Sequence, residues 1–321
     1  MGSFYAGGRP LQVEGRPIER LHVTDCIPEF AHDPNGLITV EQCYVQYFIP
    51  EECRGLPVVL VHGGGLCGTC WESTPDDRPG WVELLLQRHR SVYVIDMMER
   101  GRAGWCALPG VWPEQPIMRT AEEAWRIFRF GAAADFAGRN SFPGQMVPVD
   151  ALPELIKRFV PRWPRSEERS LPALRSAIQR IGPCAIVGHS SAAGSVYRAA
   201  MADADVVRAV VMLEPSGVTE ALADDLAGRI YGAIYGDYLD HQPMWHGLRL
   251  AVEALHEQLR SRGGQVRIVD LADEGLPGHS HMMMMDRGSE RVLSVVLGII
   301  GGASDPTGRV RGAHSVLRSL E

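Results

Sequence analysis

Hydrophobic residues occur along the chain in short continuous runs, separated by longer stretches in which apolar and polar positions alternate with a helical period. Short runs that end in glycine or polar residues are typical of strands buried on both faces of a parallel sheet. Their alternation with helices indicates βαβ units, and therefore an α/β fold with a mostly parallel central sheet flanked by helices. The predicted strands span residues 56–61, 91–96, 184–187, 207–213, 229–235 and 265–271, and the predicted helices span 81–89, 166–181, 192–201, 246–262 and 289–300.

Two regions outside this alternation have patterns of their own. Residues 43–49 have a strand pattern and follow turn signals at 33–36, so the N-terminal region predicts an antiparallel lead-in to the sheet. Between 104 and 164 the strand pattern stops, and Trp, Phe and Pro residues accompany a helical stretch. That stretch is short for an independent domain. We therefore predict a single domain over 1–321, with a cap inserted at 104–164.

Composition excludes some classes of partner. The formal net charge is −7, whereas nucleic-acid affinity depends mainly on clustered Lys and Arg, so no nucleic-acid partner is expected. No apolar run reaches the length of about 18 residues that a spanning helix needs, so no membrane span is expected. The glycine-rich start lacks an apolar signal segment, which favours a cytoplasmic protein; a secreted or periplasmic location is the alternative if a signal peptide was removed.

Seven cysteines form an odd-numbered set in a chain that is large enough to fold without disulfides. Cys67 and Cys70 form a C-x-x-C motif, which is compatible with metal or redox chemistry. A second ligand pair at zinc spacing is missing. We therefore expect neither a metal site nor a cofactor.

A motif close to G-x-S-x-G, Gly-His-Ser-Ser-Ala at residues 188–192, follows a predicted strand and precedes a predicted helix. A serine on such a sharp strand-to-helix turn is raised above the edge of the sheet, where it can attack a carbonyl carbon. Ala192 replaces the last glycine of the motif and is still small. The motif identifies Ser190 as the candidate nucleophile, and the alternative is an ordinary turn with a serine N-cap.

The sequence His62-Gly63-Gly64-Gly65 ends the predicted strand 56–61, where a hydrolase of this architecture places its oxyanion hole. Glycines let the backbone approach the developing negative charge closely, so the amides of Gly64 and Ser191 are the candidate donors. A phosphate-binding loop is the rival interpretation. It fails because no GK[ST] follows and the glycines are too close together for G-x-G-x-x-G.

The general base is expected late in the chain, because hydrolases of this kind place the nucleophile first, then the acid, then the histidine. His279 and His281 both follow the last predicted strand. Glu214 and Asp237 each follow a strand after Ser190, and the residues alone leave both as candidate acids. An unperturbed histidine has a pKa of about 6.5, so we expect activity to rise between about pH 6 and 7.

These motifs resemble the α/β-hydrolase superfamily, and within it the bacterial esterase 713 group. The resemblance covers roughly 58–131 and 184–290 and implies an α/β-hydrolase fold with carboxylic-ester hydrolase activity. The residues that carry it are Val61-His62-Gly63, Trp71-Glu72, Thr74-Pro75-Asp76, Gly80-Trp81, Tyr93-Val94-Ile95-Asp96, Arg100-Gly101-Arg102, the segment 123–131, Glu214-Pro215, Ser280-His281-Met282-Met283-Met284 and Asp286-Arg287.

The resemblance implies a triad of Ser190, His281 and Glu214. It favours Glu214 over Asp237 because Glu214-Pro215 matches the acid of the group. It favours His281 over His279 because only His281 matches the serine-histidine-methionine segment of the group.

Some positions depart from the group. Ser191 and Ala192 stand where the group has Gln and Gly. Gly64 and Gly65 stand where it often has larger residues. These departures concern the lining of the oxyanion hole, and hence the choice of substrate.

The aromatic residues of the predicted cap suggest a small-molecule ester with an apolar or aromatic part, although such residues more often form the core of the cap. Arg126 and Arg129 could meet a substrate carboxylate, but a solvated helix face is the favoured interpretation. The candidate substrate contacts are Gly65, Leu66, Trp125, Phe128 and Met282.

Other functions use the same features. A lactone or C–C bond hydrolase would employ the same triad, because fold and triad do not determine which bond is cleaved. A non-catalytic binding member of the fold is the alternative from another class, although all three triad positions are filled. A homodimer is a further possibility.

Overall fold

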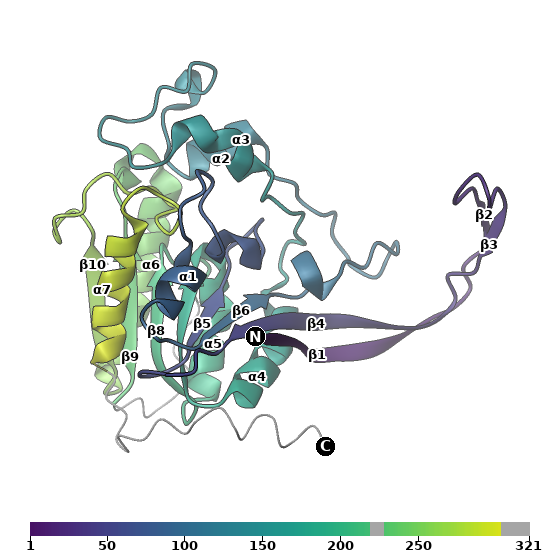
Figure 1. Cartoon of the computed structure of the whole chain (residues 1–321), viewed down its shortest axis with the longest axis horizontal. Helices are drawn as coiled ribbons and strands as arrows, with labels where there is room; N and C mark the ends of the chain where they lie inside the picture. Colours follow the sequence, from purple (N-terminus) through teal and green to yellow (C-terminus); the bar gives the residue numbers. More distant parts are fainter. Residues whose placement is uncertain (219–227, 303–321) are drawn as a thin grey trace.

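The computed structural model describes residues 1–218 and 228–302, and its centre is an eight-stranded sheet (Figure 1). Every pair from β6 to β10 is parallel, whereas β4 is antiparallel to β6 and β1 is antiparallel to β4. The mostly parallel α/β sheet and its antiparallel lead-in are thus confirmed. The strand order is β1 (Gly2–Val13), β4 (Gly36–Phe48), β6 (Val92–Asp96), β5 (Val58–Val61), β7 (Cys184–His189), β8 (Val207–Leu213), β9 (Ile230–Tyr235) and β10 (Gln265–Asp270).

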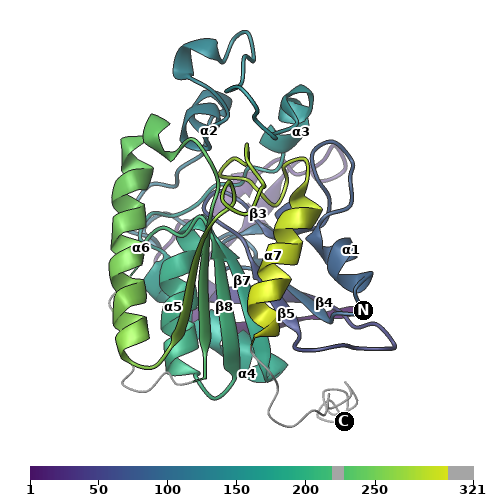
Figure 2. The same ribbon diagram turned by 90° about the vertical axis from the view of Figure 1, so that its left-hand side faces the viewer.

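Helices cover both faces of the sheet, as Figure 2 shows. Successive strand residues point to opposite faces, so β5 sends Val58 and Leu60 into one hydrophobic cluster and Val59 and Val61 into another. The first cluster includes residues of α1 and α7, and the second includes residues of α4, α5 and α6. These helices span Trp81–Leu86 (α1), Glu167–Ile181 (α4), Ala193–Ala202 (α5), Pro243–Ser261 (α6) and Ser289–Gly301 (α7).

The N-terminal arm differs most from the sequence-based expectation. The long strand β1 was not predicted, because few of its side chains are buried and it contains Gly7 and Gly8, both with positive φ. It pairs with β4 to form a ribbon that extends from the body of the molecule (Figure 1). The ribbon carries a small sheet of β2 (Glu19–Leu21) and β3 (Phe30–His32).

The segment 104–164 contains the short helices α2 (Ala121–Ile127) and α3 (Leu152–Ile156) and several 3₁₀ turns. Both views place α2 and α3 beyond the end of the sheet at which its parallel strands finish (Figures 1 and 2). A cap role for this segment stays a prediction. No helix in the described part of the chain has the length and apolarity needed to cross a bilayer.

Candidate active site at the carboxyl edge of the sheet

The candidate nucleophile Ser190 lies on the turn between β7 and α5. The strand ends at His189, and a 3₁₀ turn, Ser190–Ala192, leads directly into the helix. Ser190 has a φ of 51°, in the left-handed region that non-glycine residues rarely occupy. Strained backbone of this kind persists only where the surrounding structure holds it, and it is typical of a nucleophile elbow.

The glycine segment after β5 packs tightly against this turn. A Cβ atom on Gly63 would lie 3.1 Å from the Ser190 Cβ, and one on Gly64 would lie 2.9 Å from the Ser191 Oγ. Side chains at these two positions would therefore collide with the nucleophile turn. The two candidate oxyanion donors, Gly64 and Ser191, belong to backbone segments in direct contact.

His62 holds the start of this glycine segment in place. Its Nδ1 donates to the Gly63 carbonyl at 2.9 Å, and its Nε2 accepts from the Met97 amide at 3.1 Å. Burial lowers the pKa of His62 to about 4, so the ring is neutral at pH 7, consistent with one donating and one accepting nitrogen. Two strand ends, of β5 and β6, are thereby joined below the oxyanion segment.

Glu214 and His281 lie together at the end of β8. His281 Nδ1 is 3.5 Å from Glu214 Oε2, and both side chains are buried. The alternative candidates face elsewhere: the Asp237 carboxylate accepts from the Gly278 amide, and His279 Nδ1 lies 3.4 Å from Asp286. The geometry therefore groups Glu214 with His281.

His281 also lies against the end of β7, the strand that precedes Ser190. Its carbonyl accepts a hydrogen bond from His189 Nε2 at 2.9 Å, and the two imidazole rings are 4.6 Å apart. Within the described residues, no hydrogen bond joins Ser190 Oγ to His281. Catalytic hydrogen bonds are often long in ligand-free structures and shorten when substrate binds.

Arg129 forms a buried bidentate ion pair with Glu214. Its Nη1 is 3.0 Å from Oε2, its Nη2 is 2.6 Å from Oε1, and neither side chain is exposed. The Gly236 amide also donates to Oε1, at 2.7 Å. The expectation of a solvated face is wrong for Arg129, because the chain leaves α2 with Arg129 at a φ of 60° and turns it inward. Arg126 is exposed, as expected.

Burial and the surrounding charges together determine the protonation of Glu214 and His281. Burial raises the pKa of Glu214. Arg129 and His281 together lower it by more than burial raises it, so the pKa is about 2. Burial lowers the pKa of His281 to about 4; Arg129 and Arg119 act in the same direction, and Glu214 opposes them. At neutral pH, Glu214 is a carboxylate and His281 is a neutral imidazole.

Two aromatic side chains flank the His281 ring. The Phe128 ring stacks on it at 5.3 Å, and the Trp245 ring lies 4.2 Å away. Trp245 was missed at the sequence level, where it lies just before the predicted start of the helix at 246; the helix begins earlier because Pro243 fits its first turn.

The other candidate substrate contacts lie in packed surroundings. Trp125 is fully buried and packs on Phe130 and Phe136, and Leu66 and Met282 are also buried. The Gly65 carbonyl accepts from the Val160 amide. Substrate contact by these residues stays a prediction.

Comparison with known proteins assigns the family. A solved structure described as that of a novel bacterial esterase has a TM-score of 0.82 and 29% sequence identity, covering 95% of this chain and 96% of its own. A protein named as a probable secreted lipase, from Fungal sp. (strain ATCC 74256), is 24% identical over 313 residues, covering 79% of this chain and 84% of its own. The chain is an esterase of the α/β-hydrolase superfamily. No family model matches the chain.

In this esterase the Arg129–Glu214 pair should have a large effect on stability. Arg129→Met should lower the free energy of unfolding by about 3–5 kcal/mol, because it leaves the Glu214 charge buried without a partner. Arg126→Met removes an exposed arginine nearby, so it should change that free energy by no more than about 0.5 kcal/mol. Urea denaturation followed by fluorescence measures both.

The double variant Arg129→Met, Glu214→Leu tests the cause. It should recover most of the lost stability, because an apolar pair replaces the ion pair. An Arg129→Met variant that unfolds at the same urea concentration as Arg126→Met would contradict the role assigned to the pair.

Proposed function

We propose that this esterase cleaves carboxylic esters through an acyl-enzyme, with Ser190 as nucleophile, His281 as general base and Glu214 as the acid of the triad. The observation that carries the proposal is the Glu214–His281 contact, buried beside the strained turn that presents Ser190. A carboxylate at Nδ1 leaves Nε2 of the neutral ring free to accept a proton.

The chemistry proceeds in two steps. Ser190 Oγ attacks the ester carbonyl carbon while His281 takes the hydroxyl proton, and the protonated imidazole then gives this proton to the leaving alcohol. Water attacks the resulting acyl-enzyme with His281 again as base, which releases the carboxylic acid and regenerates the serine. The amides of Gly64 and Ser191 are the donors proposed to stabilise the oxyanion in both steps.

Arg129 has a positioning role in this scheme. Its two hydrogen bonds leave the Glu214 carboxylate little freedom to rotate, so Oε2 stays directed towards His281. The same contact neutralises much of the Glu214 charge. Glu214 therefore contributes more by orienting the imidazole than by stabilising the imidazolium.

Replacing the nucleophile tests the assignment directly. Ser190→Ala should lower kcat for 4-nitrophenyl butyrate by about 10⁶-fold and abolish labelling by a fluorophosphonate probe. Ser294→Ala, an exposed serine of α7, is the matched control and should keep full activity. Activity of Ser190→Ala within tenfold of wild type would refute the proposal. The same assay with lactones and diketones measures the alternative bond types.

The pH profile tests the base. The folded-state pKa of His281 is lowered to about 4, so the neutral, active form persists well below the unperturbed value. The value of kcat/KM should stay nearly constant from about pH 5.5 to 7.5 and fall as pH drops through about 4. This prediction differs from the sequence-based expectation of a rise between about pH 6 and 7. A fall in kcat/KM centred near pH 6.5 would contradict the prediction made from the structure.

The remaining expectations are unchanged. The cytoplasmic location stays a prediction, beside a fungal relative that is named as a secreted lipase. The homodimer also stays a prediction.

A further inference from the structure

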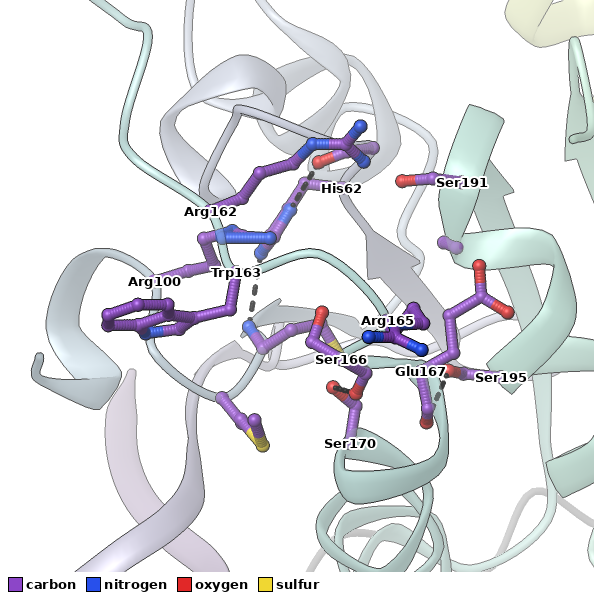
Figure 3. Close-up of a pocket in the computed structure, with 14 residues that line it drawn as sticks. His62, Arg100, Arg162, Trp163, Arg165, Ser166, Glu167, Ser170, Ser191 and Ser195 are labelled. Carbon is purple, nitrogen blue, oxygen red and sulfur yellow. Dashed lines mark hydrogen bonds between the residues drawn. The ribbon is translucent and has the colours of Figure 1, made fainter. Parts of the chain in front are cut away.

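A cavity of about 70 Å³ borders the turn that carries Ser190, and half of the residues that line it are arginines and serines (Figure 3). Ser191 and Gly63 belong to its lining, so it adjoins both the turn that presents Ser190 and the candidate oxyanion segment. Neither Ser190 nor His281 lines it. Its volume exceeds that of a single water and suits a small polar group such as a carboxylate.

Arg162 extends from the end of the 104–164 segment to this junction. Its Nη1 lies 2.7 Å from the position of a Cβ on Gly64, and the Ser191 Oγ lies 2.9 Å from the same point. Figure 3 shows its guanidinium on the side of the pocket where Ser191 lies. The Arg162 side chain forms no ion pair or hydrogen bond with a residue in the described ranges.

Arg100 adds a second, more deeply buried guanidinium to the lining. It is only 7% exposed, and its Nη1 donates to the Pro161 carbonyl at 2.9 Å. Its Nε is buried without a hydrogen-bond partner among the described residues. Burial, assisted by Arg162, lowers the pKa of Arg100 to about 9. The pocket thus contains a buried donor that a ligand oxygen could satisfy.

Two acidic groups act on these arginines through space, although neither forms an ion pair with them among the described residues: Glu99 acts on Arg100, and Glu167 acts on Arg162. Glu167 also lines the cavity but forms no ion pair with Arg162 among the described residues; burial raises the pKa of Glu167, and the charges of Arg198 and Arg162 oppose that rise. Its Oε1 is directed to the region of Gly217, 2.7 Å from the position of a Cβ there. Arg165, the third arginine of the lining, is paired with Glu114. Arg100 and Arg162 are therefore the arginines of this lining that form no ion pair among the described residues.

We infer that this pocket binds a carboxylate of the substrate, and that the preferred substrates are esters with a free carboxylate, such as half-esters of dicarboxylic acids. Arginine is the side chain best suited to a planar carboxylate. Because the pocket shares Ser191 and Gly63 with the turns around Ser190, the inference places the substrate carboxylate next to the ester that Ser190 attacks. The inference rests on the proposed function and adds the substrate class.

The test compares two substrates that differ only in the distal charge. These are the mono-4-nitrophenyl ester of adipic acid and the same compound with its free acid capped as a methyl ester. Wild type should have a higher kcat/KM for the half-ester. Arg162→Ala should lower that value by about 10- to 100-fold, the usual effect of one charge-assisted hydrogen bond, and change it less than about threefold for the capped ester.

Three further variants control for charge and packing. Arg162→Gln keeps most of the side-chain volume and should behave like Arg162→Ala. Arg162→Lys should retain part of the preference. Arg126→Ala removes an exposed positive charge from α2 and should leave kcat/KM unchanged for both substrates. Circular dichroism shows that each variant is folded.

Adipate itself separates a substrate subsite from an effector site. It should inhibit hydrolysis of the capped ester competitively in wild type and much more weakly in Arg162→Ala. Noncompetitive inhibition would identify a separate anion effector and overturn the inference.

Two other results would also overturn it. If Arg162→Ala lowered kcat/KM equally for both substrates, Arg162 would act on the oxyanion of the reaction and not on the distal carboxylate of the substrate. If the wild-type enzyme had the same kcat/KM for both substrates, it would have no preference for a free carboxylate. In either case, loss of activity on the capped ester in Ser190→Ala would still uphold the proposed function, so the two failures are distinguishable.

Discussion

The site depends on one buried charge, the carboxylate of Glu214. An ionised group without exposure is unfavourable unless hydrogen bonds and an opposite charge compensate it. Here Arg129 supplies two hydrogen bonds and the countercharge, and the Gly236 amide supplies a further bond. These partners come from the end of α2 and the end of β9, so a single charge joins the segment above the sheet to two neighbouring strands. Its remaining contact is directed to His281.

The same arrangement acts on His281, the proposed base. Burial is the main reason that His281 stays neutral although a carboxylate is in contact with it, and the nearby Arg129 guanidinium acts in the same direction. The ring is further confined by Phe128 and Trp245. A neutral, oriented and partly desolvated imidazole is the form that a general base requires. The Arg129–Glu214 pair therefore contributes both to stability and to the orientation of the imidazole, while burial keeps the imidazole neutral.

The sequence predicts the strands and helices around this site better than the tertiary contacts that hold its side chains. The strand 207–213 and the helix 289–300 match β8 and α7 almost residue for residue, because continuous apolar runs and helical periods are local signals. The Arg129–Glu214 contact joins positions 85 apart. An arginine near the end of a helix with mixed polarity gives no local indication that it is buried, and only the tertiary fold brings it to its partner.

Arg129 and Arg162 show how one residue type serves two purposes at the same sheet edge. Arg129 is enclosed, and its guanidinium is matched by a bidentate carboxylate, so a ligand would find no free donor there. Arg162 borders a cavity beside Ser191 and has no such carboxylate from the described chain. Arg100, close enough to Arg162 to be affected by its charge, leaves a buried donor unused. Two neighbouring positive charges repel each other and lose hydration when buried, which is unfavourable in the free protein. An incoming anion reduces both the repulsion and the loss of hydration, so its binding is favoured at guanidinium groups that form no ion pair with the protein.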